Sequence, residues 1–299
     1  MHIPDNFLAT PVWGTLDAVS AGAVGVTIRR AGRDLPDTRI PLLGVMGAFV
    51  FAAQMINFPV GAGTSGHLVG GALLACTIGP APAVLVMTTI LAIQAFVFQD
   101  GGVLALGANV FNMAVAGVLA GYLPFRLLGA SRRGLAIFTG GFLSVLVSGS
   151  LALCELLISG VRMPRALVFT SLGLFAMNAL IEGAITISVV QALDKLNPGF
   201  VQKPAAARGR ILVVLGCVAL LLGAAGFLIA SGSPDAIQNL GQTLGISARP
   251  AFQTPMANYA AGNFESAWLR RATAGLTGLL LICGLCAAGA RMIARRRSA

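Results

Sequence analysis

Charged residues are scarce in this chain. They make up 10% of its 299 residues, against 57% apolar residues, whereas about 25% of the residues of a soluble domain are charged. A chain this long with so few charges cannot cover a globular surface with polar groups, so a soluble fold is excluded. Basic residues outnumber acidic ones by 20 to 10, but they lie between apolar runs. That placement indicates membrane topology and argues against a nucleic-acid partner.

The sequence also lacks the patterns of a disulfide framework, a signal peptide and a phosphate-binding loop. The five cysteines lie inside apolar stretches, so no disulfide framework is predicted, and the pair Cys283 and Cys286 is interpreted as helix packing. The N-terminus has no basic region ahead of an apolar one, so we expect no cleaved signal peptide and a Met1 that stays in the mature protein. The glycine-rich segment 61–68 lacks the lysine of a phosphate-binding loop, because His67 stands in its place. We therefore expect neither ATP hydrolysis nor any other enzymatic activity from this chain.

Long apolar runs are plentiful. A membrane-spanning helix needs roughly 20 mostly apolar residues, and nine segments meet or approach that length. The first carries Asp17 and the third is short, so either can instead be re-entrant or tilted, and the count is open by one. The nine segments are 12–28, 40–57, 67–79, 81–98, 106–124, 135–159, 165–193, 211–230 and 269–290.

The basic residues fall mainly in alternate loops between these segments. In a nine-span topology, fifteen of the 20 lie on one side of the membrane and five on the other. Since positive residues stay in the cytoplasm, we predict an N-terminus outside and a C-terminus inside. The fifteen are Arg29, Arg30, Arg33, Arg39, Arg126, Arg132, Arg133, Lys195, Lys203, Arg208, Arg210, Arg291, Arg295, Arg296 and Arg297, and the five are Arg162, Arg165, Arg249, Arg270 and Arg271.

A polar, basic segment rich in proline and alanine divides the chain at 194–210. Before this linker, residues 1–193 form a predicted module of about seven spans. After it, residues 211–299 form a predicted two-helix module whose spans flank an outside loop at 231–267. The sequence therefore predicts an all-α, polytopic membrane bundle built from two modules.

Histidine occurs only twice in the chain. In the predicted topology both His2 and His67 lie at the outer face. The α-amine of Met1, the His2 amide and His2 Nδ1 can chelate one metal ion through a five-membered and a six-membered ring. The imidazole of His67 would complete four nitrogens in a plane, which suits Ni(II) or Cu(II), with Co(II) also accepted. Taken singly, each residue has an ordinary alternative, a surface histidine for His2 and a loop histidine bonded to backbone for His67.

At these residues the sequence resembles the CbiM/NikM family, the substrate-binding components of energy-coupling-factor (ECF) nickel and cobalt transporters. The resemblance rests on MHIPD at 1–5, FAAQMINFPV at 51–60, GTSGHL at 63–68, DGG at 100–102 and LGANVFNM at 106–113, and it covers roughly residues 1–195. Beyond the linker, SPD at 233–235 and PMANY at 255–259 resemble the two-helix N component of these transporters or its PDGLE-type relative, fused here in one chain.

The resemblance implies a seven-helix module in which the Met1 amine, His2 and His67 hold the ion. It also implies partners, namely an energy-coupling transmembrane subunit and a pair of ATPases. Asn6 departs from the family glycine, but asparagine tolerates a left-handed turn, so we expect the N-terminal loop to keep its path. The segment 234–238 reads Pro-Asp-Ala-Ile-Gln where the family has Pro-Asp-Gly-Leu-Glu, which leaves the role of the C-terminal loop open.

Two carboxylates lie inside predicted spans. Glu155 and Glu182 are functional candidates by default, but without a proton-relay pattern we favour helix-end or partner contacts for both. A further set of polar residues either orients His67 and the N-terminal loop or bonds helix to helix. Its members are Gln54, Asn57, Ser65, Asn109 and Asn112.

We therefore predict the substrate-capture component of an ATP-driven ECF-type importer in the cell membrane. The transported substrate is predicted to be Ni(II), with Co(II) uptake for cobalamin synthesis as the alternative, because both ions accept nitrogen ligands. No resident cofactor is predicted. An ion-coupled secondary carrier would need midplane ionisable residues and usually inverted repeats, neither of which is evident. A membrane scaffold would leave both histidines unexplained.

Overall fold

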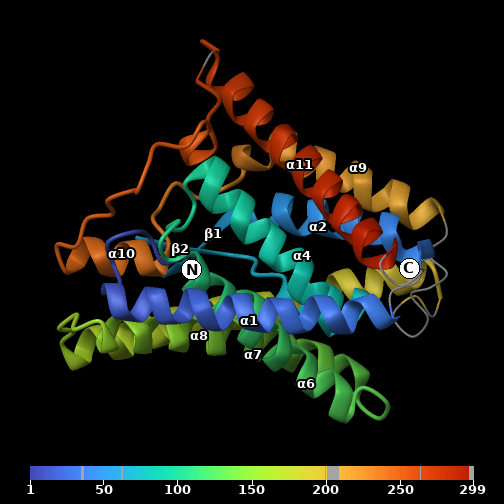
Figure 1. Cartoon of the computed structure of the whole chain (residues 1–299), viewed down its shortest axis with the longest axis horizontal. Helices are drawn as coiled ribbons and strands as arrows, with labels where there is room; N and C mark the ends of the chain where they lie inside the picture. Colours follow the sequence, from blue (N-terminus) through green and yellow to red (C-terminus); the bar gives the residue numbers. More distant parts are fainter. Residues whose placement is uncertain (35–36, 62, 199, 201–208, 263, 296–299) are drawn as a thin grey trace.

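The computed structural model describes residues 1–34, 37–61, 63–198, 200, 209–262 and 264–295. They form a bundle of helices with one small β-hairpin close to the N-terminus (Figure 1). The helices and strands are α1 (Thr10–Asp34), α2 (Ile40–Gln54), β1 (Asn57–Gly61), β2 (Thr64–His67), α3 (Gly71–Ile78), α4 (Pro80–Ile93), α5 (Leu106–Asn109), α6 (Val118–Leu128), α7 (Arg133–Ile158), α8 (Arg165–Leu196), α9 (Gly209–Ala225), α10 (Ala236–Thr243) and α11 (Ala267–Arg295). Two π-helical segments, η2 (Gln94–Phe98) and η3 (Val110–Gly117), continue α4 and α5, and 3-10 turns lie at η1 (Asp37–Arg39), η5 (Gly226–Leu228) and η6 (Ala257–Tyr259).

Within the described residues, six helices are long and apolar enough to cross a membrane. By length and composition, the nine expected spans thus reduce to six. α2 has only 15 residues and α3 only eight, while α1 carries Asp17, Arg29 and Arg30 along its length. The six are Pro80–Phe98, Leu106–Leu128, Arg133–Ile158, Arg165–Leu196, Gly209–Leu228 and Ala267–Ala294.

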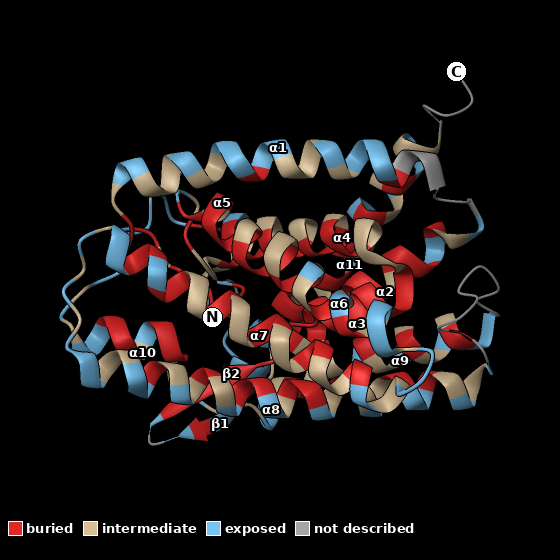
Figure 2. Ribbon diagram, turned by 90° about the horizontal axis from the view of Figure 1, so that it is seen from below, coloured by how far each residue is buried: buried red, intermediate tan, exposed pale blue. Residues whose placement is uncertain are grey.

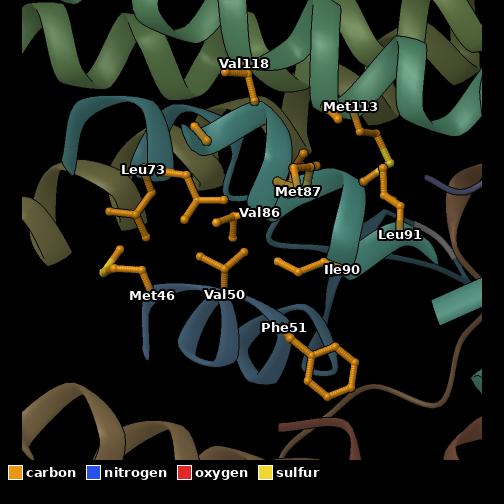
Figure 3. Close-up of a cluster of buried hydrophobic side chains, with 14 of the residues drawn as sticks. Met46, Val50, Phe51, Leu73, Val86, Met87, Ile90, Leu91, Met113 and Val118 are labelled. Carbon is orange, nitrogen blue, oxygen red and sulfur yellow. The ribbon is translucent and has the colours of Figure 1, made fainter. Parts of the chain in front are cut away.

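The centre of the bundle is formed by α2, α3 and α4. All eight residues of α3 are buried, and this region is the red interior of Figure 2. Figure 3 shows Met46 and Val50 of α2 directed toward Leu73 of α3 and toward Val86 and Ile90 of α4. In a membrane, such close packing between side chains is what holds helices together.

The helices that follow the linker pack on this same centre. Both α9 and α11 lie against α2. A Cβ on Gly44 of α2 would lie 2.9 Å from the main-chain oxygen of Cys283 in α11, so the glycine allows the two helices to approach this closely. Cys283 and Cys286 are free and lie at this contact, as the packing interpretation predicts.

A β-hairpin takes the place of the loop expected ahead of His67. β1 and β2 are antiparallel, and their register sets Asn57 opposite His67 and Pro59 opposite Ser65. The proline and glycines of 57–67 favour a loop in sequence terms, and an isolated two-stranded hairpin is only marginally stable. Here the hairpin packs against α8 and α10, which supplies the missing contacts.

The two ends of the molecule differ in what they carry. The N-terminus, the hairpin and α10 gather at one end, and the end of α11 lies at the opposite end (Figure 1). Most of the predicted linker 194–210 lies outside the described residues, because 199 and 201–208 are not described. The same holds for the basic residues Lys203, Arg208, Arg296 and Arg297 of the topology prediction.

Candidate metal site

The N-terminal segment runs into the interior of the protein. Ile3 is fully buried, its N–H donates to Asn109 Oδ1 at 2.8 Å, and its carbonyl accepts from Asn109 Nδ2 at 3.0 Å. The Gly102 N–H donates to the same carbonyl at 2.8 Å. A side chain on Gly102 would collide with Asp5, so the glycine is required for the segment to lie this close. These contacts fix the position of the first two residues.

The turn that follows joins the N-terminal segment to a loop from the other end of the chain. Asn6 has the expected left-handed conformation, with φ 73°. The Asp5 carboxylate accepts from the Leu104 N–H at 2.8 Å and from the Ala251 N–H at 3.1 Å. The N-terminal segment is thus held by the bundle on one side and by the loop that contains Ala251 on the other.

His67, the last residue of β2, presents one ring nitrogen as an acceptor. Its Nδ1 lies 2.9 Å from the carbonyl oxygen of Leu68, so this nitrogen carries the proton and donates. Its Nε2 lies 2.6 Å from the Met1 amine, which donates to it. Burial, the charge of the amine and the nearby His2 ring lower the pKa of His67 to about 3. The imidazole is therefore neutral at physiological pH, which is the form that binds metal ions.

His2 lies beside His67 but has a different partner. The two rings are stacked, with centroids 5.3 Å apart and planes inclined by 5°. His2 Nδ1 donates to Asp100 Oδ1 at 3.0 Å. Its Nε2 is buried and has no hydrogen-bond partner within the described part of the chain. The predicted chelate uses Nδ1, so Asp100 here occupies the nitrogen that the chelate requires.

Asp100 owes its position to the end of the α4–η2 helix. Gln99 has a left-handed φ of 57°, and the Asp100 N–H donates back to the Gln94 carbonyl at 2.9 Å. Asp100 Oδ2 accepts from the Tyr259 hydroxyl at 2.5 Å. Burial alone would raise the pKa of Asp100, but the His2 ring and the Tyr259 hydroxyl hold it below its ordinary value. Asp100 is thus a carboxylate that links His2 to Tyr259, which is distant in sequence.

The Met1 amine also has a partner in the C-terminal module. Asp235 Oδ2 accepts from the amine at 2.8 Å, and Asp235 Oδ1 caps α10 by accepting from the Gln238 N–H at 2.8 Å. The Ser65 N–H of β2 donates to the Pro234 carbonyl at 2.9 Å, which ties the hairpin to the same segment. Burial would raise the pKa of Asp235, but the charged amine holds it below its ordinary value. A carboxylate from beyond the linker therefore balances the charge of the N-terminus.

The main chain after His67 is fixed from inside the bundle. Glu182 of α8 is fully buried, and its two carboxylate oxygens accept from the Val69 and Gly70 N–H groups, both at 2.8 Å. Gln54 of α2 donates to the Val69 carbonyl at 2.7 Å. Buried peptide groups need such partners, and this is the helix-end contact expected for Glu182, at the start of α3. The bundle thereby sets the position of His67.

Two of the predicted supporting residues lie in the hairpin. Asn57 faces His67 across the ladder, and Ser65 Oγ donates to the Ser233 carbonyl at 2.7 Å. Ser65 thus acts on the contact between the modules rather than on either imidazole. Four of the five predicted residues therefore lie around the site, namely Gln54, Asn57, Ser65 and Asn109.

Asn112 lies away from the candidate ligands. Its Nδ2 donates to Glu155 Oε2 at 2.8 Å, and both side chains are buried. Of the two roles left open by the sequence, Asn112 has the helix-to-helix one, between η3 and α7. Glu155 is the other member of this bond between helices.

Three side chains at the site were not predicted, namely Asp100, Asp235 and Tyr259. They lie in segments that resemble the family, but nothing in those segments marks them as neighbours of the ligands. For Asp100 a usable signal exists, because it is a carboxylate placed two residues after the last residue of an apolar span and directly before two glycines. Asp235 is separated from Met1 by 234 positions, and no spacing pattern reaches across that distance.

The arrangement resembles part of a metal coordination sphere. In a square plane with metal–nitrogen bonds of about 2.0 Å, neighbouring nitrogens are about 2.8 Å apart. The Met1 amine and His67 Nε2 are 2.6 Å apart. Across the described residues, no three His, Cys, Asp or Glu side chains are grouped as metal ligands; the predicted site uses the amine and the His2 amide in addition to the imidazoles.

Comparison with protein families gives a clear match. A family model described as CbiM, cobalt uptake substrate-specific transmembrane region, matches residues 2–200. The chain belongs to the CbiM family. As a CbiM protein it is a multi-pass membrane component of nickel or cobalt uptake of the ECF type, and not an enzyme.

Curated relatives of this CbiM protein come from archaea and bacteria. A putative metal transport protein of Haloquadratum walsbyi is 41% identical over 67% of this chain and 93% of its own length. A putative fused nickel transport protein NikMN of Archaeoglobus fulgidus is 32% identical over 95% of this chain and 96% of its own. A cobalt transport protein CbiM of Acetoanaerobium sticklandii is 31% identical over 64% of this chain and 84% of its own. The match to a fused protein over nearly the whole length supports an N component joined to the CbiM region.

Solved structures also share the CbiM fold. A crystal structure of a transition metal transporter matches with a TM-score of 0.59 and 29% identity, covering 70% of this chain and all of the other. A truncated transition metal transporter gives the same TM-score at 30% identity, over 65% of this chain and 99% of the other.

Proposed function

We propose that this chain captures Ni(II) at the outer face of the membrane, with the Met1 amine, His2 and His67 as ligands. The observation that carries the proposal is the buried 2.6 Å contact between the Met1 amine and His67 Nε2, beside the stacked ring of His2. The His67 tautomer supports it, because a histidine that binds metal commonly donates its other ring nitrogen to a carbonyl. No other position in the chain offers a second pair of histidines.

Ion binding requires the ligands to exchange their partners. The amine gives up its proton and its contact with Asp235, and His2 Nδ1 gives up its contact with Asp100. The His2 amide also loses its proton if it enters the square plane, so affinity falls as the pH falls. Asp100 stays beside the ion, where its negative charge balances part of the positive charge.

Nickel is favoured over cobalt by the ligand set. Four nitrogens in a plane suit a tetragonal ion such as Ni(II). Two fused relatives, from Archaeoglobus fulgidus and Rhodobacter capsulatus, bear nickel in their names, whereas the relative from Acetoanaerobium sticklandii bears cobalt. Co(II) uptake for cobalamin synthesis is therefore the second candidate.

The proposal extends to topology, modules and partners. The N-terminus is outside and the C-terminus inside, with modules 1–193 and 211–299 joined by the linker 194–210. In Figure 1 the N-terminus and the end of α11 lie at opposite ends of the molecule, which supports placing them on opposite sides of the membrane. Energy comes from partner ATPases through an energy-coupling transmembrane subunit, so the isolated chain binds the ion without accumulating it.

The test compares two tagged forms of the purified chain. One or two residues added before Met1 displace the amine, whereas the same residues added after Ala299 leave it in place. Equilibrium dialysis should show nickel binding only to the C-terminally extended form, and equal affinity in both would remove the amine from the site. A nickel–cobalt competition on the C-terminally extended form then decides the metal.

A separate labelling experiment tests the topology. A membrane-impermeant label should modify a cysteine at Asn6, and not one at Ser298, in intact cells.

A further inference from the structure

A cavity of about 490 Å³ opens between the N-terminal module and the segment after the linker. We call it the seam cavity. Oxygen-bearing side chains from both sides line it, among them Asn57, Gln99 and Asp100 from one side and Ser231, Ser233 and Gln242 from the other. Gln242 is exposed at its rim, whereas Asn57 and Asp100 are only partly exposed, so the seam cavity extends from the surface inward.

The inner end of the seam cavity adjoins the candidate metal site. Asp100 lines it and accepts from His2 Nδ1. Asn57 lines it and faces His67 across the hairpin. Pro234, a further lining residue, directly precedes Asp235.

The candidate ligands themselves are closed off from solvent. Met1, His2 and His67 are each only 4% exposed. The Asp100 side chain, by contrast, is 23% exposed. An ion from solution therefore needs a passage, and it meets Asp100 before it meets any nitrogen ligand.

We propose that the seam cavity is the passage by which a hydrated divalent cation reaches the nitrogen site, and that Asp100 is the group that receives it. This inference rests on the proposed metal site. Six water molecules at about 30 Å³ each occupy about 180 Å³, so a fully hydrated ion fits. Amide, hydroxyl and carboxylate oxygens can replace its water molecules one at a time. Asp100 then holds the ion next to His2 Nδ1, whose proton it already accepts.

One cation lies on the wall of the seam cavity. Arg271 lines it, with its guanidinium 5.6 Å from the centroid of the Phe227 ring. A positive charge beside the passage opposes an approaching cation. Replacing Arg271 by glutamine should therefore speed nickel association at low salt, and added salt should reduce that gain.

The main experiment narrows the passage without touching a ligand. Gln242→Trp places a large side chain at the rim, and Gln253→Trp places the same side chain on an exposed residue of the same loop region that does not line the seam cavity. Stopped-flow mixing of metal-free protein with nickel, followed by a metallochromic dye, gives the association and dissociation rates. For Gln242→Trp we expect both rates to fall about tenfold while their ratio, the Kd, stays unchanged. Gln253→Trp should behave like the parent protein.

A second variant covers the case in which Gln242→Trp fails to fold. Ser231→Cys is a small change, and a bulky methanethiosulfonate added after folding narrows the same space in a protein already measured. The unsubstituted chain treated in the same way controls for the exposed Cys154 and Cys217. Modification should slow association, and a reductant should restore it.

The outcomes separate the two proposals. Unchanged rates after either obstruction overturn the passage, even though the wild-type chain binds nickel. A loss of affinity equal to the loss of association rate means that the obstruction distorts the site, and it also counts against the passage. A wild-type chain that binds no nickel overturns the proposed function instead.

Discussion

The two histidines of the candidate site are held in different ways. His67 is positioned by the bundle. Its Nδ1 donates to the Leu68 carbonyl, and Glu182 accepts from the N–H groups of Val69 and Gly70. His2 is held by Asp100, a loop residue that is itself bound by Tyr259 from beyond the linker. His67 therefore already turns its acceptor nitrogen toward the Met1 amine, whereas the chelating nitrogen of His2 is engaged by Asp100.

This difference separates the contacts that set the affinity for the ion from the contacts that set how readily the metal-free state gives way. Rigid placement of one ligand lowers the cost of ordering the site when the ion arrives. Contacts that must be exchanged, such as those of Asp100 and Asp235, set how readily the metal-free state gives way to the bound one. Each of the following predictions changes one side of this comparison.

Removal of the bundle-held ligand should have the largest effect. His67→Ala deletes one of four nitrogens, and changes to residues that merely support a ligand already cost about 10–100-fold in affinity. We expect nickel affinity to fall by more than about 100-fold, measured by equilibrium dialysis. His67→Ala should still insert into the membrane and elute as a single species, so a misfolded variant would not count as support.

Loss of the contact between Glu182 of α8 and the main chain after His67 should have the second-largest effect. Glu182→Ala leaves the Val69 and Gly70 N–H groups buried without an acceptor, at about 1–3 kcal/mol each. We expect a lower unfolding temperature together with a nickel affinity reduced by about 10–100-fold. Glu155→Ala, on the neighbouring α7, is the matched control: it also removes a buried carboxylate and should lower stability without weakening binding. Equal affinity in the two variants would show that Glu182 does not position His67.

Acid should destabilise the metal-free protein through His67. The pKa of this residue is lowered to about 3, whereas an unfolded histidine titrates near about 6.5. Between these values the unfolded chain binds a proton that the folded chain does not, so stability is unaffected above pH 6.5 and falls as the pH drops below it. The loss should reach about 2 kcal/mol at pH 5. His67→Gln should lack this component when unfolding free energies are compared at pH 7 and pH 5.

Weakening the contact between Asp235 and the Met1 amine, which the ion must displace, should raise the affinity for nickel. Asp235→Asn takes away the charge that competes with the ion for the amine, while asparagine still caps α10. We expect the metal-free protein to unfold at a lower temperature, the nickel-bound protein to be unchanged, and nickel to bind about tenfold more tightly, or about 1.4 kcal/mol. Weaker binding would mean that Asp235 contributes to the bound state.

The smallest effect should come from Tyr259. Tyr259→Phe removes one hydrogen bond to Asp100, worth about 0.5–1.5 kcal/mol, and leaves the ring stacked against Phe98, whose centroid lies 4.7 Å away. A less firmly held Asp100 should give up His2 Nδ1 more readily, so nickel association should speed up a few-fold. An unchanged association rate would show that the tyrosine only packs.

The sequence predicts the helical membrane bundle and the meeting of its two histidines, and it fails where local patterns conflict with packing. The run 67–79 reads as a span because every residue after His67 is apolar or small, yet it contains the end of β2 and the eight-residue α3. Hydropathy records how apolar such a segment is and not whether lipid or other helices surround it. The hairpin was missed for a related reason, since its stability comes from α8 and α10 and not from its own residues.

Within the site, contacts close in sequence or made by a rare residue type could be predicted. The Met1–His2 chelate follows from adjacency, and His67 follows from the scarcity of histidine. Asp235 and Tyr259 could not be found in this way, because an aspartate and a tyrosine in a polar loop are ordinary and their partners lie at the far end of the chain. Only the folded structure shows that the altered loop motif at 234–238 keeps a carboxylate that binds the amine.

The Met1–Asp235 ion pair also dictates an order of assembly. Met1 meets this carboxylate only after 234 further positions have been translated. Until the segment that carries α10 has been made, the Met1 amine lacks its contact with Asp235, and the loop that carries Tyr259 has not reached Asp100. These contacts therefore form late in biogenesis, so a chain that stops before Asp235 lacks the groups that hold Met1 and His2 in place.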